Sequence, residues 1–259
     1  MRLMILDNRE KAGAWAARYI AGRIKSFGNS EPFVLGLPTG SSPLVIYQEM
    51  VKMCRAKELS FKNVRTFNMD EYVGLPKEHP GSYHRFMMEN LFDHVDIDPK
   101  HIRILDGMAQ DKEKECGDYE RAIKSAGGIE LFLGGMGGNG HIAFNEPGSS
   151  FASRTRVIDL AQETINDNAR FFDGDLSKVP KSAMSVGIGT IMDAREVVII
   201  VTGKNKARAL RSVIEEGVNH MYPLSCLQMH ANATIVCDED ATDELRVGTV
   251  RYFKSMEKG

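Results

Sequence analysis

The sequence has little of what metal, redox and secreted proteins depend on. Its four cysteines, Cys54, Cys116, Cys226 and Cys237, are scattered and form no C-x-x-C pair, so neither a zinc site nor a redox dithiol is expected. A disulfide framework is not expected in a chain of this size either. The histidines show no H-x-x-x-H or H-E-x-x-H spacing, so no metal site is expected.

Charge of one sign and long apolar runs are also missing. The formal net charge is -2 at pH 7 over 259 residues, so no overall basic field points to nucleic acid. No apolar run approaches the length of a membrane span, and the one near the N-terminus is too short for a signal peptide. We therefore expect a reduced, cytoplasmic protein in which an anionic ligand would be held by local donors.

What the sequence does contain is a regular alternation of short apolar runs and helical patterns. Strands are expected over residues 3–6, 33–37, 64–67, 131–133, 184–186, 197–201 and 234–237, and helices over 8–27, 43–55, 82–92, 112–126, 205–216 and 240–253. This order predicts a single α/β domain over 1–259, with a mostly parallel open sheet and helices on both faces, a Rossmann-like three-layer sandwich. The region at 149–180 is more polar than the rest of the chain, and the segment at about 160–181 is expected to form a lid.

Four loops with unusual composition directly follow predicted strands, over 36–43, 68–72, 134–148 and 202–206. In open α/β sheets, ligands bind beyond the carboxyl ends of the strands. If the sheet is parallel, all four loops lie on one rim. This convergence is the main argument for a functional site.

The third of these loops resembles a dinucleotide-binding motif. Gly135-Met-Gly137-Gly-Asn-Gly140 matches G-x-G-x-x-G, but that motif needs a helix after its last glycine to receive the pyrophosphate. Here the segment from His141 to Glu146 is followed at once by Pro-Gly, which is too short for such a helix. A dinucleotide site is therefore not favoured, and a tight glycine turn without a ligand is the simplest alternative.

The same loop carries a histidine and a carboxylate close together. His141 and Glu146 could form an acid–base couple, since a carboxylate that accepts one imidazole N–H leaves the other nitrogen free to move a proton. The alternative is a hydrogen-bonded loop histidine. Asp70 and Glu71 end another strand, and because neighbours in extended backbone point to opposite faces, only one of them can face a ligand. A pair of solvated loop carboxylates is the alternative there.

A small, hydroxyl-rich loop forms the best candidate anion site. Thr39, Gly40, Ser41 and Ser42 follow a predicted strand and precede a helix that starts near Pro43. Free backbone N–H groups and hydroxyls make an anion cradle. The P-loop lysine is missing, so a monophosphate suits the loop better than a nucleoside triphosphate. A simple capping turn is the alternative.

Several longer motifs resemble the glucosamine-6-phosphate deaminase family. They are FNMDEYVGLP at 67–76, HPGSYHRFM at 79–87, GHIAFNEPGSS at 140–150, SRTR at 153–156 and GVNHM at 217–221. The similarity runs from residue 1 to about 253. It implies the conversion of glucosamine 6-phosphate and water into fructose 6-phosphate and ammonia, without an organic cofactor or metal, in a homo-oligomer that is often a hexamer.

The resemblance also implies roles for individual residues. Asp70 matches the family's base for proton transfer between C2 and C1, and His141, oriented by Glu146, matches the group that opens the sugar ring. Arg170 and Lys206 match the cations that bind the phosphate together with the loop at 39–42.

Two departures from the family pattern modify these expectations. Asn139 stands where family members usually carry Asp, which leaves a non-catalytic or weakly active sugar-phosphate binder as an alternative function. The related 6-phosphogluconolactonases are a less favoured alternative, because they typically read D-E-R at 70–72 and lack A-F-N-E after the histidine.

The second departure concerns an effector site. Ser149, Arg156 and Tyr252 match part of the site at which some bacterial members bind N-acetylglucosamine 6-phosphate, but Ile158-Asp159 replaces Lys-Thr there. The loss of a cation and the gain of an anion oppose phosphate binding, so we expect activation by that effector to be weak or absent.

Overall fold

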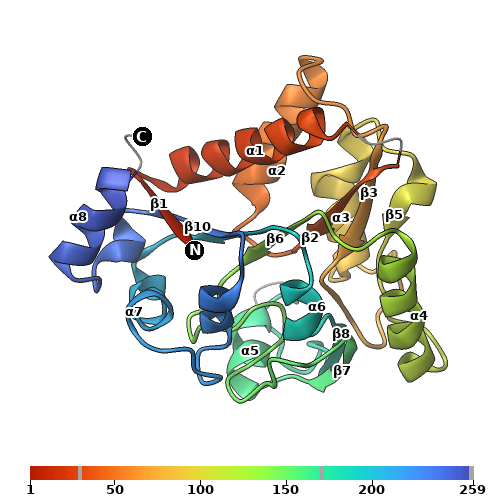
Figure 1. Ribbon diagram of the computed structural model, residues 1–259. Helices are drawn as coiled ribbons and strands as arrows, with labels where there is room; N and C mark the ends of the chain where they lie inside the picture. Colours follow the sequence, from red (N-terminus) through yellow and green to blue (C-terminus); the bar gives the residue numbers. More distant parts are fainter. Residues whose placement is uncertain (29–30, 170–171, 257–259) are drawn as a thin grey trace.

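The computed structural model describes residues 1–28, 31–169 and 172–256, and its centre is a seven-stranded sheet (Figure 1). All of its neighbouring strands pair in parallel, which confirms the predicted parallel α/β architecture. In spatial order the strands are β1 (Arg2–Leu6), β10 (Ala233–Asp238), β9 (Val197–Val201), β6 (Leu131–Gly135), β2 (Phe33–Leu37), β3 (Val64–Asn68) and β5 (Ile102–Arg103).

The sheet is buried on both faces because helices cover both. α1 (Arg9–Ser26), α2 (Leu44–Arg55) and α3 (Tyr83–Asn90) pack against one face, and α4 (Lys112–Ser125), α6 (Ile188–Met192) and α7 (Ala207–Glu215) pack against the other. Strand β9 illustrates why its sequence is a continuous apolar run. Val198 and Ile200 join the core under α1 and α2, whereas Ile199 and its alternate neighbours join the core under α6 and α7.

A second, three-stranded antiparallel sheet lies beside the large one, and the sequence did not predict it. Its order is β4 (Asp70–Tyr72), β8 (Ser182–Ser185) and β7 (Arg156–Asp159). The strand predicted at 184–186 is real, but it runs through the middle of this small sheet. A short apolar run indicates a buried strand but not its direction or its partner. The pairing of β8 with β4 therefore could not be predicted from the local sequence.

Some predicted boundaries were wrong. The closing helix expected over 240–253 is divided into a 3₁₀ turn, η6 (Asp240–Thr242), and α8 (Val247–Met256), because the backbone turns at Leu245, whose N–H bonds the carbonyl of Thr242. The sequence did not predict the 3₁₀ helices η4 (Lys204–Lys206) and η5 (Pro223–Met229) as separate elements.

The segment expected to be a lid, 160–181, contains the short helix α5 (Gln162–Asn168) and turns. It packs by Leu160, Phe172 and Val179 against Tyr72 of the small sheet and Phe144. Within the described part of the chain, no helix combines the length and the apolar character needed to cross a bilayer.

Candidate active site

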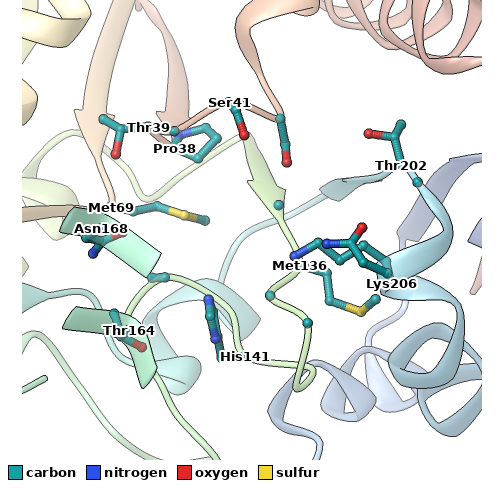
Figure 2. A pocket seen from close by; sticks show the side chains of 18 of the residues that line it. Pro38, Thr39, Ser41, Met69, Met136, His141, Thr164, Asn168, Thr202 and Lys206 are labelled. Atoms are coloured by element: carbon teal, nitrogen blue, oxygen red, sulfur yellow. The ribbon is translucent and has the colours of Figure 1, made fainter. Parts of the chain in front are cut away.

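A cavity of about 670 Å³ opens at the carboxyl ends of the parallel strands. Figure 2 shows Thr39, His141, Thr164 and Lys206 around it. All four loops that the sequence placed on one rim contribute to its lining, so the expected convergence is observed. Arg9, Tyr83, Asn168 and Asp238 also line the cavity, and sequence reasoning did not select them.

The glycines of the G-x-G-x-x-G loop make room for His141. A Cβ on Gly137 would lie 2.1 Å from Cε1 of His141, so the imidazole packs directly on the backbone there. Gly140 has a positive φ of 82°, and a Cβ on it would lie 2.9 Å from the ring of Tyr222. No helix follows Gly140, and the chain turns through an isolated bridge between Ile142 and Asn145 instead. The loop therefore has the shape of a histidine support and lacks the helix that a dinucleotide needs.

His141 is linked to Glu146 through Asn139. Nδ1 of His141 lies 2.8 Å from Oδ1 of Asn139, and Nδ2 of Asn139 donates to Oε2 of Glu146 at 2.8 Å. The direct separation of His141 Nδ1 from Glu146 Oε2 is 3.6 Å, which is too long for a hydrogen bond. Thr164 of α5 donates its hydroxyl to the other oxygen of Glu146. One hydrogen-bonded chain thus runs from α5 to the imidazole.

The donors and acceptors in this chain set the histidine tautomer. A carboxylate only accepts, so the Asn139 amide presents its NH₂ to Glu146 and its oxygen to His141. The backbone N–H of His141 also donates to that oxygen, at 3.2 Å. An oxygen acceptor requires Nδ1 to carry the proton, which leaves Nε2 as the free acceptor in the neutral ring. Burial favours the neutral acid at Glu146, but His141, Thr164 and Asn139 favour the carboxylate and lower the pKa of Glu146 to about 2.

Asp70 contributes a buried carboxylate to the same cavity. The residue is 6% exposed, and Oδ1 has no hydrogen-bond partner among the described residues. Burial raises the pKa of Asp70 to about 8, and the neighbouring carboxylate of Glu71 adds to the shift. A carboxylate of this kind is a stronger base than one in water and holds its proton close to neutral pH.

Glu71 points to the opposite side, as the alternation of an extended strand requires. One carboxylate oxygen accepts the backbone N–H groups of Tyr72 at 2.8 Å and Tyr83 at 3.0 Å, and the other accepts that of His84 at 2.8 Å. Burial raises the pKa of Glu71, and the backbone donors oppose the shift. Glu71 therefore ties β4 to the start of α3, which carries Tyr83 to the cavity.

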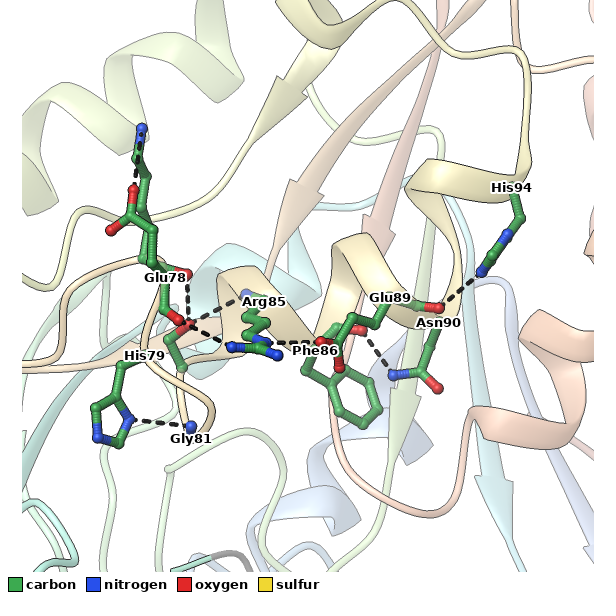
Figure 3. Close-up of polar contacts among 10 residues, drawn as sticks. Glu78, His79, Gly81, Arg85, Phe86, Glu89, Asn90 and His94 are labelled. Carbon is green, nitrogen blue, oxygen red and sulfur yellow. Dashed lines mark hydrogen bonds and ion pairs between the residues drawn. The ribbon is translucent and has the colours of Figure 1, made fainter.

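Further polar contacts hold α3 and the turn before it (Figure 3). His79 Nδ1 accepts the backbone N–H of Gly81 at 3.0 Å, and Arg85 pairs with Glu89 at 2.6 Å. Arg85 also donates to the carbonyl of Glu78 at 3.3 Å. The motif HPGSYHRFM therefore builds the support of Tyr83.

The candidate anion cradle has the predicted position. Thr39, Gly40, Ser41 and Ser42 line the cavity between β2 and α2, and Gly40 has a positive φ of 94°. Lys206, in η4 after β9, lines the same cavity. Arg170, the second predicted cation, lies outside the described residues. Among the described residues, no group of three or more His, Cys, Asp or Glu side chains is placed to hold a metal ion.

The cavity residues that sequence reasoning missed fall into two groups, those at strand ends and those placed by the small sheet. Arg9 comes shortly after β1, and Asp238 is the last residue of β10, so the rule about strand ends could have found both. Tyr83, Thr164 and Asn168 reach the cavity from α3 and α5, whose placement depends on the small sheet. Nothing local in the sequence marks that placement.

Known proteins resemble this chain over nearly its whole length. Glucosamine-6-phosphate deaminase 2 of Xenopus tropicalis is 60% identical over 258 residues, covering 99% of this chain and 94% of the relative. Glucosamine-6-phosphate deaminase of Drosophila melanogaster is 57% identical, with the same coverage. A solved structure of a monomeric glucosamine-6-phosphate deaminase superposes with a TM-score of 0.91 at 39% identity, covering 95% of this chain and all of that one.

More distant structures share the fold. A 6-phosphogluconolactonase from Trypanosoma cruzi has a TM-score of 0.74 at 18% identity, covering 94% of this chain and 96% of that one. The family model for glucosamine-6-phosphate isomerases and 6-phosphogluconolactonase matches residues 7–236. With a rim cavity and a family model that spans most of the sequence, the chain belongs to the glucosamine-6-phosphate isomerase/6-phosphogluconolactonase family.

Proposed function

We propose that this protein is a glucosamine-6-phosphate deaminase, which converts glucosamine 6-phosphate and water into fructose 6-phosphate and ammonia. The observation that carries the proposal is the pairing, in one cavity, of a buried carboxylate with an unpartnered oxygen, Asp70, and a histidine of set tautomer, His141. The identity of 57–60% to proteins named as such deaminases supports the substrate.

The substrate phosphate binds in the cradle formed by Thr39, Gly40, Ser41 and Ser42. Lys206 adds a positive charge there, and Arg170 is proposed as a second cation on the lid segment 160–181. Hydroxyls, backbone N–H groups and cations together suit a phosphate dianion. Closure of the segment over the sugar would exclude water during proton transfer.

Ring opening is assigned to His141. Its free Nε2 accepts the proton of the anomeric hydroxyl, and the imidazolium then protonates the ring oxygen as the C1–O bond to it breaks. The positive charge that forms on the imidazole of His141 is stabilised by Glu146 through Asn139. Asn139 acts here as a positioning residue, because it holds Nδ1–H and transmits no proton itself.

Asp70 then moves a proton between the two carbon atoms. It removes the proton from C2 of the open-chain aldehyde to give an enediol-type intermediate, an aminoenol, and returns that proton to C1, while a proton passes from the C2 amino group to the aldehyde oxygen. The product is an imine at C2, which water hydrolyses to the ketone with release of ammonia. Removal of a carbon-bound proton needs a base whose pKa is raised toward that of the working pH, and the burial of Asp70 supplies this property.

Asn139 motivates the second candidate function, a sugar-phosphate binder with little or no turnover. The amide of Asn139 holds the histidine but adds no negative charge beside it. The negative charge that stabilises the imidazolium therefore has to come from Glu146, which lies behind Asn139 in the hydrogen-bonded chain. A lactonase activity is less supported, because the lactonase structures are similar only in fold.

Ammonia release from glucosamine 6-phosphate by the wild type and by Asn139→Asp tests the proposal. We expect turnover by the wild type and a modest increase with Asp, which adds charge beside His141 but also places a second carboxylate next to Glu146. Activity in Asn139→Asp alone would establish the binder instead. Absence of ammonia in both, with substrate bound, would contradict the deaminase.

We also propose that the protein is a homo-oligomer, such as a hexamer. Tyr252 and Met256, one turn apart on α8, are 58% and 65% exposed and form a small apolar surface that a partner subunit would cover. Sedimentation velocity measures the mass in solution. A single species at 28.8 kDa would contradict this part of the proposal.

A further inference from the structure

Arg9 reaches the anion cradle from a part of the chain that the family motifs do not include. It is the first residue of α1, directly after β1, and its Nη2 donates to the backbone carbonyl of Ser41. Arg9 lines the cavity together with Ser41, Ser42 and Lys206. Its guanidinium therefore stands at the edge of the proposed phosphate site.

The described residues do not neutralise this guanidinium. No carboxylate oxygen among them lies within ion-pair distance of Arg9, and its Nε is buried without a hydrogen-bond partner. Two carboxylates close to Arg9 in the chain or in the cavity wall have other partners: Asp238 accepts the N–H groups of Gly203 and Ala241, and Asp7 pairs with Lys11. A guanidinium has five donors and accepts nothing, so a buried donor left unpaired costs free energy until an acceptor arrives.

The requirements of α1 do not explain the arginine either. The helix is capped by Asn8, whose side chain accepts the N–H of Lys11. The helix dipole places partial positive charge at its N-terminus, which favours anions and disfavours a cation in the first turn. An arginine at this position is favourable when an anion binds in front of it.

We propose that Arg9 is a ligand of the substrate phosphate, which adds a guanidinium to the cradle and to Lys206. A planar fork of N–H donors matches two phosphate oxygens, and Nε is one of the two donors such a contact uses. The inference rests on the proposed function for the identity of the phosphate ester. Binding of an anion at Arg9 can be measured without turnover.

Calorimetric titration of the full-length protein with inorganic phosphate tests the inference. The variants are Arg9→Gln, which removes the charge, and Arg18→Gln, a matched control. Arg18 lies on the exposed side of the same helix, roughly 13 Å further along its axis. We expect the phosphate Kd to rise about tenfold in Arg9→Gln and to stay within about twofold of the wild type in Arg18→Gln.

A merely structural role for Arg9, through its bond to Ser41, predicts a different pattern. The variant would then melt at a lower temperature without phosphate, and its phosphate affinity would be unchanged. A ligand role predicts a near-normal melting temperature without phosphate and a smaller increase when phosphate is added. Equal phosphate affinity in the wild type and Arg9→Gln overturns the inference.

Steady-state kinetics separate this inference from the proposed function. If both hold, Arg9→Gln raises the KM for glucosamine 6-phosphate about as much as it raises the phosphate Kd, with a much smaller change in kcat. If the wild type releases no ammonia but loses phosphate affinity on Arg9→Gln, the deaminase is contradicted and the anion site stands. A raised phosphate Kd with an unchanged KM would overturn Arg9 as a substrate ligand.

Discussion

The two sheets contribute to the cavity in different ways. The seven-stranded sheet supplies the rim loops, with the anion cradle, Lys206, Arg9 and the histidine loop. The three-stranded sheet supplies Asp70, and its flanking segments carry Tyr83 and Thr164 to the cavity. Groups proposed to bind the substrate thus lie mainly on the parallel frame, whereas the proposed carbon base lies on the small sheet. Asp70 keeps its raised pKa because β4 is buried, and β4 is held in place by its pairing with β8.

The neighbours Asp70 and Glu71 show this difference at the level of single side chains. Both are almost fully buried, but Glu71 accepts three backbone N–H groups and Asp70 has an oxygen with no partner among the described residues. One carboxylate therefore stabilises the fold, and the other stays available for a ligand at a cost in stability. Replacing each carboxylate by its amide, and measuring both activity and stability, is the most direct way to test the comparison.

Asp70→Asn should have the largest effect. The amide cannot accept a proton from C2, so we expect kcat to fall about a thousandfold while phosphate binding stays close to wild type. Ammonia release and phosphate calorimetry on the same sample measure both quantities. Substantial turnover in this variant would remove Asp70 from the proposed role.

The pH dependence gives an independent measurement on Asp70. The base must be ionised, so kcat/KM of the wild type should rise with pH up to about 8. The raised pKa in the folded state also means that the folded protein holds a proton which the unfolded chain has lost. The free energy of unfolding of the wild type should therefore fall as pH rises from about 4 to 8. The free energy of unfolding of Asp70→Asn, relative to that of the wild type, should accordingly be higher near pH 8 than near pH 5.

Gly137→Ala tests whether the glycine loop exists to hold His141. Its Cβ would overlap the imidazole, which must move, and we expect kcat to fall about a hundredfold. Gly138→Ala is the matched control, since its Cβ would meet no atom closer than 3.9 Å. Equal activity of the two variants would show that the loop tolerates a displaced histidine.

Glu71→Gln should act on stability before it acts on chemistry. The Gln amide places an NH₂ group where one carboxylate oxygen accepts, so at least one buried backbone N–H loses its acceptor and the free energy of unfolding should fall by about 2 kcal/mol. Urea denaturation at neutral pH measures this change, and kcat should fall far less than in Asp70→Asn. A variant as stable as the wild type would contradict the assigned role of Glu71.

The effector prediction concerns the smallest effect. Ile158 of β7 packs against the apolar cluster of Tyr72 and Leu160, and Asp159 is exposed beside it. Addition of N-acetylglucosamine 6-phosphate should shift the half-saturating substrate concentration by less than about twofold. A clear sigmoidal-to-hyperbolic change would show that Arg156 and its neighbours bind the effector without the missing lysine.

Sequence reasoning reached the parallel sheet and the rim, because those features have local signals. The run Val197–Val201 is apolar on both faces since both faces are covered, and each rim loop directly follows such a run. The alternation of an extended strand also showed that only one of Asp70 and Glu71 could face a ligand. It could not say which one.

By itself, the sequence determined the succession of buried strands and covering helices, and the chemical groups available at the strand ends. Only the tertiary structure decided that β8 pairs with β4 and β7, that Asn139 stands between His141 and Glu146, and that Arg9 bends over the loop after β2. The physical reason is that burial and helical periodicity are properties of neighbouring residues. The partner of a polar group depends on segments that meet only when the chain folds, such as Arg9 with Ser41 or Glu146 with Thr164.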